Sequence, residues 1–138
     1  MEWFVLAILS AFSAALVAIF AKIGLQGVDS DVATAVRAVV MMAFIIAFVV
    51  SIGKGPQLTQ LTSKDAGFIV LSGIAGALSW LFYFAALKLA DASKVAPIDK
   101  ASILFVLVLS ALFLAEKITP KIAIAAALIF IGVLLLAF

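Results

Sequence analysis

The sequence contains no cysteine and no histidine. Without cysteine the chain forms no disulfide, and without both residues it lacks the commonest ligands of structural zinc. Histidine is also the side chain that most often transfers protons near neutral pH. We therefore expect neither a metal ion nor another cofactor, and we expect that the protein is not an enzyme.

Charged residues are scarce as well. They make up 12% of the 138 residues, whereas 68% of the residues are hydrophobic. An ordinary soluble domain has about a quarter charged and about half apolar residues. The nine Lys and Arg residues are scattered and form no basic run, which argues against nucleic acid as a partner. The composition instead predicts an integral membrane protein whose surroundings are the lipid bilayer.

Long apolar runs predict an all-α protein with five transmembrane helices. A bilayer core is about 30 Å thick and a helix rises about 1.5 Å per residue, so each span needs roughly 20 residues. The chain has room for about five spans and no separate extramembrane domain. The predicted helices cover about residues 3–25, 32–52, 66–89, 96–115 and 120–137, within a single domain of residues 1–138.

Capping residues are expected at the starts of four of these helices. A side chain that accepts hydrogen bonds satisfies the free N–H groups of the first turn, and proline loses nothing at that position. The expected starts are Ser30 and Asp31 for the second helix, Thr62, Ser63 and Asp65 for the third, Pro97 for the fourth, and Thr119 with Pro120 for the fifth.

The basic residues are divided almost evenly between the two sides of the membrane. Five spans place Lys54, Lys64, Lys117 and Lys121 on the side of the N-terminus, and Lys22, Arg37, Lys88, Lys94 and Lys100 on the other. An excess of Lys and Arg on one side normally fixes the orientation, and a difference of one residue does not. Either a partner fixes the topology, or the chain inserts in both orientations.

The second possibility leads to a specific assembly. Many transporters consist of two inverted repeats, with the substrate site at the interface of the repeats. Because a unit of five spans inverts the next copy along a chain, a free-standing unit is half of such a transporter. We therefore predict an antiparallel homodimer.

Charged residues inside the spans are candidates for function, because each costs on the order of 2.5 to 3.5 kcal/mol near a helix centre. Arg37 lies about six residues into the predicted second helix. Its long side chain either extends to the membrane interface, binds a carboxylate or phosphate through its planar guanidinium, or pairs with Asp99. For Lys22, near the end of the first span, extension to the interface is the favoured interpretation.

Two polar stripes follow helical spacing. Asp99, Ser102, Val106 and Ser110 share one face of the predicted fourth helix, and Ser72, Gly76, Ser79 and Tyr83 share one face of the third, with Trp80 beside them. Neighbouring residues on a helix point about 100° apart, so Asp99 and Lys100 are expected to have separate partners. The stripes serve either close helix packing or a solute pathway.

Three segments resemble the EamA domain of the drug/metabolite transporter superfamily over nearly the whole chain. FAKIGLQGVDSDVATAVRAVV is similar to the family pattern of a Lys ending the first helix and an Arg within the second, here Lys22 and Arg37. LSGIAGALSWLFYFAALKLADASKVAP resembles the family's Gly-rich third helix, with its aromatic stretch and an exit at Lys88. FLAEKITP is similar to the turn that follows the fourth helix, at Glu116.

Most proteins of this kind are fused pairs of five-helix repeats that act as secondary exporters or uptake carriers of small metabolites, so the resemblance implies such a transporter. One feature departs from the pattern: a Pro usual in the fourth helix would fall at Ile103, whereas this sequence has Pro97 followed by Asp99 and Lys100. The resemblance therefore does not identify the solute. Its implied location is a multi-pass position in the plasma (inner) membrane of a prokaryote.

We therefore predict a solute carrier that works by alternating access. Asp99 is the candidate for proton or ion coupling, while Arg37 and Lys100 favour anionic or zwitterionic solutes. The predicted pathway residues are Arg37, Ser79, Trp80, Tyr83, Asp99, Lys100 and Ser102, with Lys22 and Glu116 as secondary candidates. Two alternatives stay open: a non-transporting subunit or assembly partner of a heteromeric complex, and a lipid carrier or flippase component.

Overall fold

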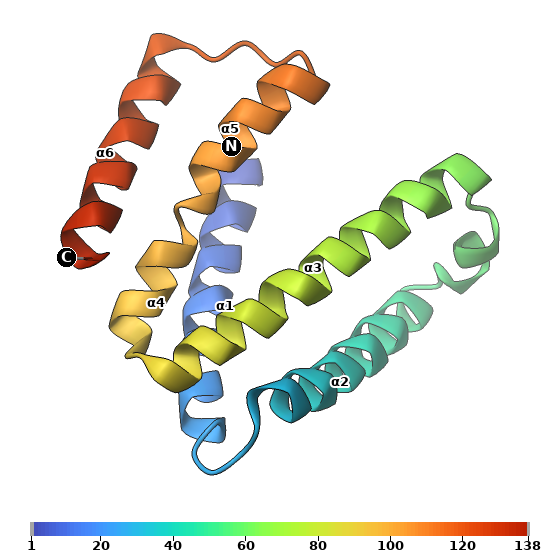
Figure 1. The fold of residues 1–138 in the computed structure, drawn as a ribbon. Helices are drawn as coiled ribbons and strands as arrows, with labels where there is room; N and C mark the ends of the chain where they lie inside the picture. The colour runs from blue at the N-terminus through green and yellow to red at the C-terminus, as the bar shows by residue number, and fades with distance from the viewer. Residues whose placement is uncertain (1, 138) are drawn as a thin grey trace. The chain divides into compact units, whose positions relative to one another are not determined.

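The computed structural model describes residues 2–137. In this range the regular elements are helical and none is a strand, which confirms the predicted all-α fold. Figure 1 shows their order along the chain: α1 (Glu2–Gly24), α2 (Ser30–Ser51), the short 3₁₀ helix η1 (Gly55–Thr59), α3 (Ser63–Leu89), α4 (Ala92–Asp99), α5 (Ser102–Phe113) and α6 (Pro120–Ala137).

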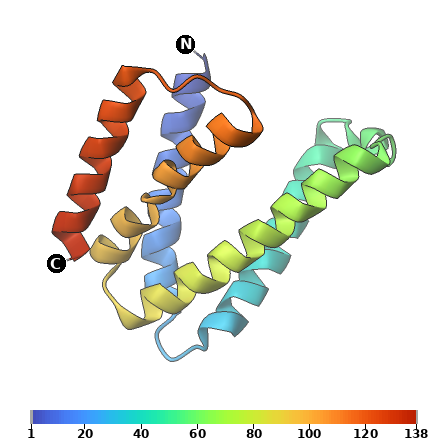
Figure 2. The same cartoon turned by 45° about the horizontal axis from the view of Figure 1, so that its top comes forward.

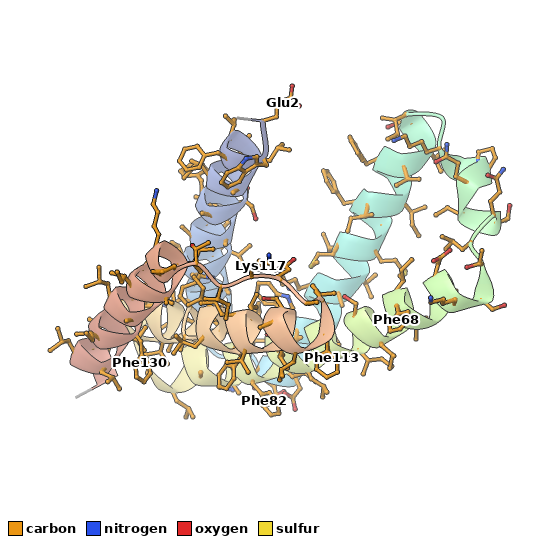
Figure 3. The ribbon with its side chains drawn as sticks, turned by 90° about the horizontal axis from the view of Figure 1, so that it is seen from above. Glu2, Phe68, Phe82, Phe113, Lys117 and Phe130 are labelled. Atoms are coloured by element: carbon orange, nitrogen blue, oxygen red, sulfur yellow. The ribbon has the colours of Figure 1, made fainter. Side chains whose placement is uncertain are left out.

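Four stretches of the described chain are long and apolar enough to cross a membrane. They are Glu2–Gly24, Ser30–Ser51, Ser63–Leu89 and Ala92–Phe113, the last comprising α4 and α5. Helix α6 has 18 residues, at the short end of the range of about 17 to 25 residues for a span. Large apolar side chains stand outwards, among them the labelled Phe68 and Phe82 on α3 and Phe113 on α5 (Figure 3). Such a surface suits lipid and would be poorly soluble in water, so the protein is an integral membrane protein.

The chain folds as two compact units. One is Ile23–Lys88, in which α2 and α3 form a helical hairpin joined through η1 (Figures 1 and 2). The other consists of the described residues before and after that segment, and in it α6 lies beside α4 and α5.

The capping side chains act largely as predicted. Thr62 Oγ1 donates to Asp65 Oδ2 at 2.6 Å and accepts the Asp65 N–H at 3.2 Å, which closes the first turn of α3. Proline opens α6 at Pro120, as expected, and Thr119 Oγ1 accepts the N–H of Ile122 at 3.4 Å. These side chains satisfy N–H groups that the helix leaves unpaired.

The cap of α2 lies one residue earlier than predicted, at Asp29. Its carboxylate accepts the N–H of Asp31 at 2.9 Å and that of Val32 at 3.3 Å. These two backbone hydrogen bonds hold the pKa of Asp29 below its ordinary value, and the positive charge of Lys88 acts in the same direction.

The predicted fourth helix, residues 96–115 opening at Pro97, is wrong in two respects. Helix α4 already begins at Ala92, and Pro97 lies inside it. The helix then ends at Asp99, and a turn at residues 100–101 separates it from α5. The N–H of Lys100 donates to Pro97 O at 3.0 Å and that of Ala101 to Ile98 O at 2.9 Å. Proline removes one helical hydrogen bond and crowds the preceding turn. The backbone here therefore forms hydrogen bonds between residues three apart, as in a 3₁₀ helix.

Gly53 ends α2 with a positive φ of +74°. The N–H of Lys54 donates to Val49 O and that of Gly53 to Val50 O, both at 3.0 Å. This pair of bonds is the Schellman motif, whose left-handed residue is usually glycine.

Replacing Gly53 with alanine is expected to lower the free energy of unfolding by about 1 kcal/mol. A Cβ added there meets nothing within 4 Å, so the loss comes from the backbone conformation alone. Gly67→Ala is the matched control: it lies within α3, its Cβ also meets nothing within 4 Å, and it should stabilise the helix slightly. Unfolding in detergent followed by circular dichroism measures both, and equal stability of the two variants would contradict the expectation.

Candidate functional site

Arg37 of α2 and Trp80 of α3 form a cation–π contact inside the α2–α3 hairpin. The guanidinium carbon of Arg37 lies 3.5 Å from the centroid of the Trp80 ring and 5.6 Å from that of Phe84. A cation within about 6 Å of an aromatic face is attracted by the electrons of the ring, and tryptophan binds it best. Sequence reasoning placed both residues in the pathway, and the structure brings them together.

The hairpin sets Arg37 and Trp80 at comparable depth. Lys88 Nζ, near the end of α3, donates to Val28 O at 2.9 Å, so the end of α3 and the start of α2 lie at the same end of the hairpin. At 1.5 Å per residue, Arg37 lies about 10 Å and Trp80 about 14 Å from that end. The Arg37 guanidinium is therefore held over a ring that lies at least as far from this end of the hairpin as the Arg37 backbone does. This geometry favours a fixed position over extension to the nearer interface.

The aromatic neighbours hold Trp80 in place. Its ring packs edge to face against Tyr83 and Phe84, with ring centroids 5.5 Å and 5.8 Å apart, respectively. The ring centroids of Tyr83 and Phe84 are 6.4 Å apart. Such edge-to-face arrangements suit the charge distribution of aromatic rings. We call Arg37, Trp80, Tyr83 and Phe84 the Arg37 cluster.

Stacking offsets only part of the cost of a charged Arg37. Insertion of an arginine near a helix centre costs on the order of 3 kcal/mol, whereas a cation–π contact gives about 0.5 to 2 kcal/mol. The guanidinium has five N–H donors, and within residues 23–88 it makes no ion pair and no hydrogen bond to protein. Its edge is thus suited to an anion that accepts two parallel hydrogen bonds.

Phe84 is the member of the cluster that sequence reasoning missed. It is 3% exposed and lies one helical turn after Trp80, and the spacing of four residues places both on one face. That spacing was the available signal. Of the predicted stripe Ser72, Gly76, Ser79 and Tyr83, Tyr83 belongs to the cluster, whereas Ser79 is exposed.

Asp99 and Lys100 pair with each other, contrary to the expectation of separate partners. Lys100 Nζ lies 3.2 Å from Asp99 Oδ2, with the two side chains 62% and 37% exposed, respectively. The expectation assumed a continuous helix, but α4 ends at Asp99 and Lys100 lies in the turn. Outside a continuous α-helix, the side chains of neighbouring residues are no longer held about 100° apart around the helix axis.

The same turn interrupts the stripe that begins at Asp99. A three-residue repeat turns about 20° further per residue than an α-helix, so the offsets no longer define one face. Ser102 is exposed at the start of α5, whereas Ser110 is buried and its hydroxyl donates to Leu107 O at 3.2 Å. The hydroxyl of Ser110 thus finds its hydrogen-bond partner within its own helix.

The two secondary candidates have different surroundings. Lys22 Nζ donates to Ala90 O at 2.8 Å. Glu116 is exposed in the segment after α5, next to Ala115, whose φ is +53°. Among residues 2–137, no three acidic side chains gather to hold a metal ion.

A family model described as "EamA-like transporter family" matches residues 1–138. The chain belongs to the EamA-like transporter family. The match confirms the resemblance seen in the three sequence segments, and it makes the protein a multi-pass membrane transporter.

A curated relative agrees with membership of the EamA-like transporter family. It is a protein of Sinorhizobium sp. named "Uncharacterized transporter in cobO 3'region", 44% identical over 136 residues. These residues are 99% of this chain and 96% of the relative. No solved structure matches the chain significantly. In this member of the EamA-like transporter family, then, the Arg37 cluster places a charged side chain against aromatic rings within the α2–α3 hairpin.

Proposed function

We propose that the protein is half of a secondary transporter, which dimerises in antiparallel orientation and moves a small metabolite by alternating access. One observation carries the proposal: the Sinorhizobium relative is named a transporter, although the 136 matched residues already make up 96% of it. A transporter of that size is no longer than one five-helix unit. Two inverted copies supply the two repeats that alternating access uses in many carriers.

The distribution of charge supports the antiparallel arrangement. Four basic residues on one side of the predicted topology face five on the other, so neither orientation is favoured. A chain that inserts both ways produces the two inverted partners without a second gene product.

Residues of both units have proposed roles. Arg37, Ser79, Trp80 and Tyr83 line the solute path on the hairpin, and Asp99 carries the coupling proton or ion, with Lys100 and Ser102 beside it. A carboxylate at an interrupted membrane helix suits coupling, because broken helices form the ion and substrate sites of many transporters.

The absence of cysteine gives a direct test of orientation. Gln26→Cys lies between α1 and α2, and Gln57→Cys lies in η1 on the opposite side of the predicted membrane; both native side chains are exposed. In intact expressing cells, a membrane-impermeant maleimide should label roughly half of each variant if both orientations occur. Labelling after detergent lysis, which reaches all copies, is the control.

Complete labelling of one variant and none of the other would overturn the antiparallel dimer. In that case the oligomeric state and the partners of the purified protein decide between the remaining hypotheses. A stable complex with a different membrane protein would support a subunit of a heteromeric assembly, whereas a parallel homodimer would support neither arrangement.

A further inference from the structure

We infer that the Arg37 cluster recognises a carboxylate group of the transported solute, with Trp80 as the residue that positions the guanidinium. This inference rests on the proposed transport function and adds a substrate class to it. The deciding observation is the placement of the Arg37 guanidinium 3.5 Å above the Trp80 ring, inside a predicted membrane span.

The stacked geometry leaves the N–H groups of the Arg37 guanidinium available for a ligand. A guanidinium lying on a ring uses its flat face for that contact, so its N–H groups point sideways, in the plane of the group. The Trp80 ring is itself braced by Tyr83 and by the buried Phe84. The contact with this braced ring therefore restricts the guanidinium before a ligand arrives, which reduces the entropy lost on binding.

The charge balance indicates an anion. The acidic residues of this unit are Asp29, Asp31 and Asp65. The Asp29 carboxylate caps the start of α2, and the Asp65 carboxylate accepts the hydroxyl of Thr62 at the start of α3. Within residues 23–88 none of the three forms an ion pair with Arg37. A carboxylate matches the planar, two-pronged donor set better than a neutral amide does, because both of its oxygens accept and carry the charge.

The source of the anion is a solute rather than a lipid headgroup. Headgroup phosphates lie at the membrane surface, and Arg37 is held about 10 Å along its helix from the nearer end. Its guanidinium lies over a ring that is no closer to that end. A solute entering the path reaches this depth, whereas a headgroup does so only if the bilayer deforms.

The chain has two tryptophans, which makes Trp80 a local reporter. Trp3→Phe leaves Trp80 as the single tryptophan. This protein, in nanodiscs of phosphatidylcholine, is titrated with propionate and with its neutral isostere propionamide, while Trp80 emission is recorded. We expect a saturable change with propionate and none with propionamide. Arg37→Gln should weaken propionate binding about tenfold or more, and Arg37→Lys should weaken it less, because lysine keeps the charge and loses the planar fork.

Lys64→Gln is the matched control, because it also removes one positive charge but from an exposed position at the start of α3. It should bind propionate like the parent. Thermal unfolding of each variant establishes that it is folded, and Arg37→Lys keeps the test decisive if Arg37→Gln fails to fold.

The carboxylate assignment would be overturned by an equal response to propionamide, by a response in Arg37→Gln equal to that of the parent, or by no saturable response to propionate. A response to inorganic phosphate but not to propionate would also overturn it. Phosphatidylglycerol in the nanodisc could also change Trp80 emission and abolish the response to propionate. In that case a lipid headgroup occupies the site, and the assignment of the anion to a solute is wrong. Propionate binding in a protein of uniform orientation would retain the site and reject only the dimer.

Discussion

Replacing Asp99 with asparagine is expected to abolish solute uptake driven by a pH gradient, while exchange of solute at equal concentrations continues. Asparagine has nearly the same size as aspartate but binds and releases no proton at physiological pH. Asp99 lies at the end of α4, and its carboxylate pairs at 3.2 Å with the side chain of Lys100, the first residue of the turn. Both groups lie where the membrane helix is interrupted, and broken helices form the ion and substrate sites of many transporters.

The measurement uses proteoliposomes, an imposed pH gradient and the carboxylate that binds best in the Trp80 titration. Asp91→Asn is the matched control, because Asp91 is exposed at the start of α4 and its side chain makes no capping hydrogen bond. That variant should retain the uptake of the parent. Full gradient-driven uptake by Asp99→Asn would show that the coupling residue lies elsewhere.

Replacing Leu87 with alanine is expected to lower the free energy of unfolding by about 2 to 4 kcal/mol. Leu87 is the side chain of α3 that is completely buried, with 0% exposure. Truncation removes packing contacts that the surroundings regain only in part. The lower part of the range is expected, since lipid is as apolar as leucine and the loss is mainly one of close packing.

Leu89→Ala provides the comparison within the same helix. Leu89 is 89% exposed at the end of α3, so its truncation leaves no cavity and should change stability by less than about 0.5 kcal/mol. Titration with a denaturing detergent, followed by circular dichroism, measures both variants. Equal losses for the two leucines would contradict the packing assigned to Leu87.

The Arg37 cluster could be predicted in part from the sequence. An arginine inside an apolar run is recognisable because it is costly there, and a tryptophan between serines and aromatics is equally conspicuous. Their contact was not predictable, since residues 37 and 80 belong to different helices. Which faces meet depends on how each helix is rotated about its axis. In a helix that is apolar on nearly every side, hydrophobic spacing gives little indication of that rotation.

The interruption between α4 and α5 shows a second limit. Pro97 was recognised as a helix signal, but proline fits the first turn of a helix and also the last turns before a break. Asp91, whose extended backbone precedes Ala92, marks the true start. With the start moved, Asp99 comes at the end of one helix instead of near the beginning of another, and its pairing with Lys100 follows.

The sequence by itself determined the class of this protein, the approximate extent of its spans and its near-zero charge bias. These properties follow from composition and from local rules of capping and hydrophobicity that act over a few residues. Only the tertiary structure decided that Arg37 lies on Trp80, that Phe84 braces the ring, and that Asp99 pairs with its neighbour. Those contacts depend on how the chain turns between helices and on which helix faces meet, and in a uniformly apolar sequence the packing of side chains settles both.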